Sequence, residues 1–195
     1  DALTTGRYNV AVGMYALSTE DGHGFNVAIG RSALQTLNAG IDAYNVAVGY
    51  DAGAAMSTGP YNTIVGALAG DALTTGDRNV AIGTSALGTE TAYGKNVAIG
   101  TNTLTIQNAG ADTYNVAVGY NAGLAVTTGV SNTLIGGQAG DSLTTGGYNV
   151  AIGRAALATE NAHGRNVAIG YEALYTLDAG ADAYNIAIGY KAGTA

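Results

Sequence analysis

Hydrophobic and polar positions alternate in a short stretch that recurs along the whole chain, as in NVAIG at 26–30. Val27 and Ile29 share one side of this stretch and Ala28 lies on the other, a period of two that is typical of a β-strand. β-Branched residues also favour a pleated surface. The residues between the stretches are rich in Gly, Asn, Asp and Thr, so the pattern predicts short strands joined by tight turns.

The stretch occurs eleven times, and its opening Asn recurs in steps of 17, 19, 17 and 17 along the chain. These four steps together form a longer super-repeat. The 195 residues hold super-repeats 1–70 and 71–140 and an incomplete one, 141–195, which we interpret as a single repeat domain, 1–195. Because the chain begins with Asp and ends within a repeat, we expect it to be a piece of a longer protein.

One coil, the stretch from one motif Asn to the next, is too short to bury its own Val and Ile. Stacked coils can bury them, because each strand pairs with its neighbour and the apolar columns merge into one core. The sequence therefore predicts an all-β fold, a parallel β-roll or β-solenoid of about eleven coils of 17 or 19 residues, each with two short strands. The two extra residues of the longer coils are expected to bulge outward near 38–44, leaving the strands in register.

Two columns of the repeat have a predicted structural role. Gly occupies the fourth place after the motif Asn in every coil, where we expect a tight turn or positive φ. The stacked Asn side chains are expected to form a ladder, each bonded to its equivalent in the next coil. This predicted ladder comprises Asn9, Asn26, Asn45, Asn62, Asn79, Asn96, Asn115, Asn132, Asn149, Asn166 and Asn185.

The central residue of each strand suggests an interface. With Val and Ile in the core, this residue would point outward, where Thr, Lys or Glu would be usual. A column of Ala there indicates close approach by another chain, although a thin rod of low charge could also simply expose Ala. The predicted interface comprises Ala11, Ala28, Ala47, Ile64, Ala81, Ala98, Ala117, Leu134, Ala151, Ala168 and Ala187.

Composition excludes several classes of protein. Charged residues are only 11% of the chain and the net charge is −7, with no basic run of the kind that binds nucleic acid. There is no cysteine, so disulfide frameworks and thiolate metal sites are excluded. No apolar stretch is long enough to cross a bilayer.

Recurring acidic residues and histidines do not indicate an active site. Glu20, Glu90 and Glu160 each lie one super-repeat apart, whereas catalytic carboxylates form a local pair in distinct environments. We interpret them as turn residues, and His23 and His163 as exposed turn residues, since the equivalent position in the middle copy is a tyrosine. The chain is predicted not to be an enzyme and to need no cofactor.

Two other columns leave alternatives open. Oxygen ligands for Ca²⁺ could come from a recurring set of acidic and amide side chains, which could equally cap backbone donors in solvated turns: Asp42, Asp112 and Asp182 with Asn38, Asn108 and Asp178. Tyrosines often precede the motif Asn, where they could bind sugars or stack on each other: Tyr8, Tyr44, Tyr61, Tyr114, Tyr148 and Tyr184.

The repeat resembles two known kinds of fibrous protein. NVAIGRSAL, NVAIGTSAL and NVAIGYEAL are similar to the repeats of trimeric autotransporter adhesin heads (YadA-like), and TTGRYNVAVG and TTGDRNVAIG to those of bacteriophage tail fibres. The adhesin resemblance implies a left-handed parallel β-roll in a homotrimer, with Val and Ile inside each roll and small residues between chains. The coils of this chain are longer than those of adhesin heads.

The favoured function is a structural fibre: a segment of an extracellular adhesin shaft or head, a phage tail fibre or a self-assembling filament. We expect it at a cell surface or on a virion, bound to copies of itself laterally and end to end, and possible further partners are a host-surface glycan or protein. A carbohydrate-binding or carbohydrate-active solenoid is the alternative, but that would need acidic residues confined to one copy. An ice-binding solenoid would need a Thr-x-Thr column on a strand.

Overall fold

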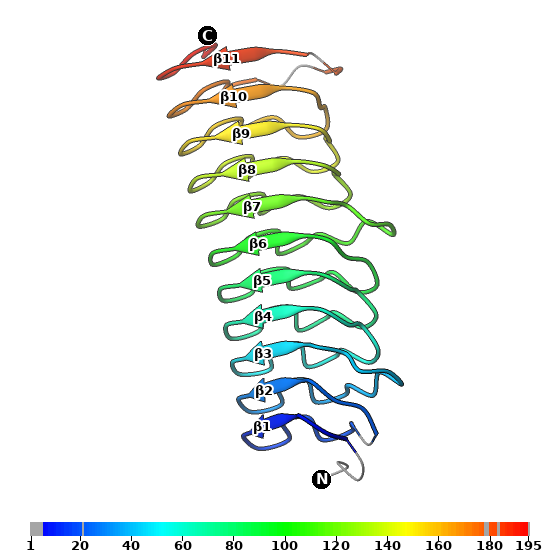
Figure 1. Ribbon diagram of the computed structural model, residues 1–195. Coiled ribbons are helices and arrows are strands. Elements are labelled where there is room, and N and C mark those ends of the chain that lie inside the picture. The colour runs from blue at the N-terminus through cyan, green and yellow to red at the C-terminus, as the bar shows by residue number, and fades with distance from the viewer. Residues whose placement is uncertain (1–5, 21, 178–179, 183, 195) are drawn as a thin grey trace.

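The computed structural model describes residues 6–20, 22–177, 180–182 and 184–194. Eleven parallel strands of three residues form one sheet in chain order, stacked like steps from the N-terminal to the C-terminal end (Figure 1). The strands are β1 (Val10–Val12), β2 (Val27–Ile29), β3 (Val46–Val48), β4 (Thr63–Val65), β5 (Val80–Ile82), β6 (Val97–Ile99), β7 (Val116–Val118), β8 (Thr133–Ile135), β9 (Val150–Ile152), β10 (Val167–Ile169) and β11 (Ile186–Ile188). The predicted all-β solenoid is confirmed.

Register is the same at every step of the sheet. Ala98 in β6 pairs with Ala117 in β7 across one of the longer coils, just as Ala81 in β5 pairs with Ala98 across a shorter one. The extra residues of the longer coils project as loops after β2 and β6 (Figure 1). Gly40 and Gly110 lie in these loops with positive φ and open space around them, so the predicted outward bulge is confirmed.

The second strand predicted for each coil is absent from the described residues. The leg opposite the strand is a run of tight turns instead. In the coil of β2, Ala33 N–H donates to the Gly30 carbonyl at 3.4 Å and Leu37 N–H donates to Leu34 at 3.2 Å. Ser32, in the first of these two turns, has a φ of 56°, which is incompatible with an extended strand.

The orientation predicted for the strand residues is wrong. Val97 and Ile99 are half-buried on the outer face of the sheet, whereas Ala98 between them is completely buried. The residues predicted to form an interface between chains are instead core residues of a single roll: Ala28, Ala47, Ile64, Ala81, Ala98, Ala117, Leu134, Ala151, Ala168 and Ala187 are buried, and only Ala11, in the first strand, is exposed.

The width of the core explains this inversion. Alternation with period two shows that Val and Ile share a side, but it does not show which side faces inward. The turn leg supplies buried leucines such as Leu34, Leu87 and Leu104 to the core. The space between the strand and the turn leg holds one leucine and one small side chain. Ala on the strand therefore fits opposite the leucine, whereas Val or Ile there would overfill the core.

In two coils the large core residue comes from the strand and the small one from the turn leg. In β8 the central residue is Leu134, and glycine stands at the place that elsewhere holds leucine. A Cβ added to Gly123 would lie 2.8 Å from Leu134 Cδ1, and one added to Gly140 would lie 2.9 Å from Leu134 Cδ2. Ile64 has the same relation to Gly53 and Gly70. A large residue from the strand therefore fills the space that a turn leucine occupies in other coils.

The turns impose a local conformational cost on the chain. In the described residues, 28 non-glycine residues have positive φ, including the residue before every motif Asn. Such a conformation costs about 1–2 kcal/mol for most L-residues. An isolated coil would therefore not hold this shape, and the fold depends on bonds and packing between neighbouring coils.

Exchanging the two core residues of the β8 coil tests this packing. We expect L134A to lower the free energy of unfolding by about 2–5 kcal/mol, because it leaves a cavity, and G140L to be destabilising because its side chain meets Leu134. The double variant reproduces the Ala28, Leu34 and Leu37 set of the β2 coil and should recover most of the loss. Denaturant unfolding measures this coupling, and additive losses would contradict the proposed packing.

Candidate functional surface: the strand face

The outer face of the sheet is a continuous and mostly apolar surface, with threonine at two of its places. Each strand contributes two outward side chains, so that two columns run along the stack without a charged residue. Most are half-buried by their neighbours, and exposure is greatest at the ends, as for Ile186 at 74%. The columns comprise Val10, Val27, Val46, Thr63, Val80, Val97, Val116, Thr133, Val150, Val167 and Ile186, and Val12, Ile29, Val48, Val65, Ile82, Ile99, Val118, Ile135, Ile152, Ile169 and Ile188.

An aromatic and cationic column precedes the strands. It consists of the residue before each motif Asn, which is aromatic or cationic everywhere except at Ser131, and its first four rings stack from coil to coil. Tyr8 and Phe25 have ring centroids 4.8 Å apart, Phe25 and Tyr44 4.7 Å, and Tyr44 and Tyr61 5.7 Å. The guanidinium of Arg78 continues the stack 5.4 Å from the Tyr61 ring.

The column that follows the strands, directly after the motif glycine, has aromatic or cationic residues at six of its eleven places. Arg31 lies 5.1 Å from the Tyr50 ring and donates a hydrogen bond to its hydroxyl at 2.8 Å. Further along, the rings of Tyr171 and Tyr190 stack at 5.3 Å, with Arg154 over Tyr171. The strand face is thus flanked by aromatic and cationic residues along nearly all of one side and along part of the other.

The stacking geometry bears on the sugar-binding interpretation of the tyrosines. A sugar packs on an aromatic ring through the flat face of the ring. The faces of Phe25, Tyr44 and Tyr61 are covered by neighbouring rings or by Arg78, which leaves ring edges and hydroxyls for solvent. The geometry therefore favours mutual packing of these residues over a row of sugar platforms.

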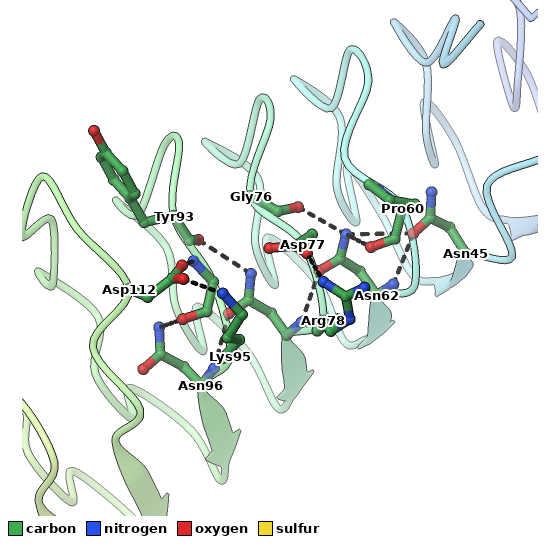
Figure 2. Close-up of polar contacts among 12 residues, drawn as sticks. Asn45, Pro60, Asn62, Gly76, Asp77, Arg78, Tyr93, Lys95, Asn96 and Asp112 are labelled. Atoms are coloured by element: carbon green, nitrogen blue, oxygen red, sulfur yellow. Dashed lines mark hydrogen bonds and ion pairs between the residues drawn. The ribbon is translucent and has the colours of Figure 1, made fainter. Parts of the chain in front are cut away.

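The motif Asn residues form one stacked column, as predicted, but the predicted bond between their side chains is found at only three steps (Figure 2). At all ten steps, the side-chain oxygen of one motif Asn accepts the backbone N–H of the next, at 2.8–3.2 Å. Direct bonds between side-chain amides occur at only three steps, for example from Asn62 to Asn45 at 3.3 Å. Each Asn therefore satisfies a buried backbone donor of the following coil.

The Asn amide nitrogen also closes its own coil. In the seven shorter coils that begin at a described motif Asn, it donates to a backbone carbonyl near the end of the same coil, as from Asn62 to Gly76 at 2.9 Å (Figure 2). In the longer coils headed by Asn26 and Asn96, it donates instead to the carbonyl two residues earlier. The column thus joins the start of a coil both to its own end and to the next coil.

The motif glycine brings backbones of adjacent coils into close contact. Gly100 has a φ of 130°, and a Cβ there would lie 2.6 Å from the Gly119 carbonyl oxygen of the next coil. The same conflict recurs along the column, so the predicted positive φ is confirmed and no larger residue fits.

The recurring glutamates are turn residues, as predicted, but they are completely buried. They occupy a core column that other coils fill with Leu37, Met56, Leu73, Gln107, Val126, Leu143 and Leu177. Each side chain accepts backbone N–H groups of its own turn: Glu90 Oε1 accepts from Thr91 at 3.1 Å and from Tyr93 at 3.3 Å. Burial raises the pKa of the Glu90 carboxyl above its ordinary value of 4.5, although these hydrogen bonds oppose the shift.

The middle super-repeat has a polar network in its core beside Glu90. Gln107 Nε2 donates to Glu90 Oε2 at 3.3 Å and to Thr113 Oγ1 at 2.7 Å, while Gln107 Oε1 accepts from Asn115 at 2.9 Å. Thr113 in turn donates to Asn96 at 2.6 Å. In the first super-repeat the equivalents of Gln107 and Thr113 are Leu37 and Ala43, so the two polar residues replace an apolar pair together.

The recurring aspartates are caps. Asp42, Asp112 and Asp182 each accept the N–H of a glycine in the preceding coil, at 2.8–3.2 Å. Asp112 also pairs with Lys95 (Figure 2), and Asp182 with Arg165. These bonds support the capping interpretation over a Ca²⁺ site. Asn38 and Asn108 lie on the exposed bulges, and Asp178 lies outside the described residues.

The histidines and acidic residues do not gather into a metal-ligand group in the part of the chain that the structure describes. No three His, Cys, Asp or Glu side chains there form a group suited to a metal ion. His163 Nδ1 lies 3.3 Å from Glu160 Oε1 within one turn, and both histidines are half-buried rather than exposed. The described residues also contain no helix long and apolar enough to cross a membrane.

Comparisons with protein families, with curated proteins and with solved structures find no match to this chain. The candidate surface therefore depends on the geometry of the chain itself. Sequence reasoning missed the Val and Ile columns as an outer face. One signal could have identified them: glycine replaces leucine in the turn leg only in the third and fourth coils of each super-repeat, next to Ile64 or Leu134 at the centre of a strand, and this indicates that the strand centres face the core.

The buried carboxyl of Glu90 makes the free energy of unfolding depend on pH. Because its pKa is raised in the folded state, folding favours the protonated form, so this group destabilises the fold as pH rises from about 4.5 through the folded-state pKa. We expect E90Q, which keeps an acceptor oxygen, to remove this contribution. Its free energy of unfolding relative to wild type should increase with pH over that interval, as measured by denaturant titrations at several pH values. A constant difference would contradict the assignment.

Proposed function

We propose that this protein is a structural fibre segment whose strand face packs against copies of the same chain. The observation that carries the proposal is the continuous face of Val and Ile on the stack of coils, in which Thr63 and Thr133 are the only other residues. Eleven strands at about 4.8 Å spacing span about 50 Å, and three residues span about 10 Å, so the strands alone present about 500 Å². The largest apolar patch on a monomeric protein is about 300–600 Å² and is often functional.

A copy of the chain is the partner that best fits this surface. Any partner that covers all eleven strands must present apolar side chains at the spacing of successive strands. Another copy of the chain does so, because its strands have the same spacing. No charged residue lies in the strands to repel an identical face. With part of the flanking columns, the contact reaches the roughly 800 Å² per partner of a stable interface. Tyrosine and arginine, which flank the face, are enriched at such interfaces.

End-to-end association is a second element of the proposal. The outermost described strands, β1 and β11, pair on one side only. Each can extend the ladder with a further coil of the same repeat, whether from the same chain or from another copy. A rod that is extended axially and covered laterally has the properties of a shaft or filament.

The biological setting of the proposal comes from the repeat pattern. The similarity to adhesin heads and phage tail fibres supports an extracellular location, on a cell surface or virion, and a three-fold lateral arrangement. The proposed interface differs from the one that the resemblance implies, because we place Val and Ile, rather than the small residues, between chains. The alternative of a carbohydrate-binding solenoid is less well supported, because the stacked ring faces are covered.

Charge placed on the strand face should prevent lateral assembly without unfolding the roll. We expect I99K to shift the protein from oligomer to monomer in sedimentation velocity runs while its circular dichroism is unchanged, because a lysine would have to be buried between apolar faces. The control is I41K, which changes an exposed isoleucine on the bulge after β2 and should assemble normally. A wild-type protein that is monomeric at all concentrations, or an I99K variant that assembles like wild type, would contradict the proposal.

A further inference from the structure

Two pairs of tyrosines in adjacent coils stack in a nearly parallel arrangement outside the core. Tyr44 and Tyr61 have ring centroids 5.7 Å apart, and Tyr171 and Tyr190 have centroids 5.3 Å apart, each pair with an interplanar angle of 9°. All four are open to solvent, with exposed fractions of 47%, 48%, 38% and 74%. Each pair bridges two successive coils whose side chains have no covalent link to each other.

We propose that these pairs are sites of oxidative cross-linking, at which a haem peroxidase supplied with hydrogen peroxide joins the two rings through a carbon–carbon bond. Each phenol loses one electron and one proton to the oxidant. The two phenoxyl radicals couple at ring carbons ortho to their C–O carbons, and the hydrogens on those ortho carbons move to the oxygens, which restores both phenols. The peroxide is reduced to two water molecules, and the pair loses two hydrogen atoms.

The fold favours coupling within these pairs. The fixed register of the sheet holds Tyr171 next to Tyr190 through the paired strands β10 and β11. Two radicals formed there are already neighbours, and such pre-positioning greatly increases the rate of a bond-forming step. The Glu172 carboxylate raises the pKa of the Tyr171 phenol and is available to accept its proton as the electron leaves, while Arg154 donates a hydrogen bond to the same hydroxyl at 3.0 Å.

A covalent link at these positions would have a clear structural effect. The chain contains no cysteine, so it cannot join its coils by disulfides. A bond between Tyr44 and Tyr61 would tie the coil of β2 to that of β3. A bond between Tyr171 and Tyr190 would do the same for the last two strands, near one end of the described stack.

The stack contains its own matched controls. Phe25 stacks on Tyr44 at 4.7 Å, closer than Tyr61 does, but it has no hydroxyl and cannot form a phenoxyl radical. Y61F and Y190F keep the stacked ring and remove one hydroxyl each, so they should preserve the fold. F25Y adds a hydroxyl within the stack and should create a new link to Tyr8 or Tyr44.

The experiment oxidises dilute protein with peroxidase and hydrogen peroxide and maps the linked peptides by mass spectrometry. We expect two links within one chain, Tyr44 to Tyr61 and Tyr171 to Tyr190, each lighter by two hydrogens. Dityrosine fluorescence per chain should not change over a tenfold range of protein concentration. Y61F should abolish the first link only, Y190F the second only, and F25Y should add a third.

Three results would overturn the proposal. The first is the absence of links at both pairs under conditions in which free tyrosine couples. The second is linkage spread equally over tyrosines without a stacked tyrosine partner, such as Tyr93 and Tyr120. The third is a yield that rises with protein concentration together with dimer bands on a denaturing gel, because this would show coupling between chains.

Discussion

Contact between the backbones of successive coils is the constraint on which this structure depends. The glycine column allows one coil to approach the next so closely that a Cβ would collide with the neighbouring carbonyl. The Asn column then satisfies the buried N–H groups that this approach removes from water, at every described step. Both columns require the same residue in each coil, and this explains why the motif varies so little along 195 residues.

The strained turns are stable only within this stack. Residues such as Tyr61, Leu87 and Ser85 hold positive φ at places where glycine would be more favourable. They supply side chains that glycine lacks, for the outer columns and for the core. The thin core has a further consequence: with alanine inside, the larger Val and Ile side chains of each strand must lie outside. The apolar outer face is thus a result of the way the core is filled.

Much of the architecture could be predicted from the sequence because it depends on spacing. The steps between motif residues fix the coil number, the parallel register and the position of the bulges, and the columns at Asn96 and Gly100 indicate stacking. The side of the strand that faces inward could not be derived from alternation alone, because Val97 and Ala98 fit a period of two in either orientation. That choice is decided by volume across the core, between the strand and the turn leg.

The buried polar residues show a second limit of sequence reasoning. Glu90 recurs at the super-repeat spacing like a surface turn residue. It is nevertheless buried, because it occupies a core column that is apolar in most other coils. Gln107 and Thr113 become meaningful only when they are seen to bond to each other and to Glu90. Sequence spacing identifies where such residues recur. Their burial and their hydrogen-bond partners become known only when the path of the turn leg is known.

The reactivity of single cysteines introduced into β6 tests the central claim most directly, because the chain has no cysteine of its own. The account predicts that the thiol of I99C reacts rapidly with a thiol reagent in dilute protein and is protected as concentration rises, whereas the thiol of A98C reacts slowly at every concentration. Rapid reaction of A98C in folded protein, or an I99C thiol that is inaccessible when dilute, would contradict the orientation of the strands. An I99C thiol that stays reactive at high concentration would contradict the use of this face for assembly.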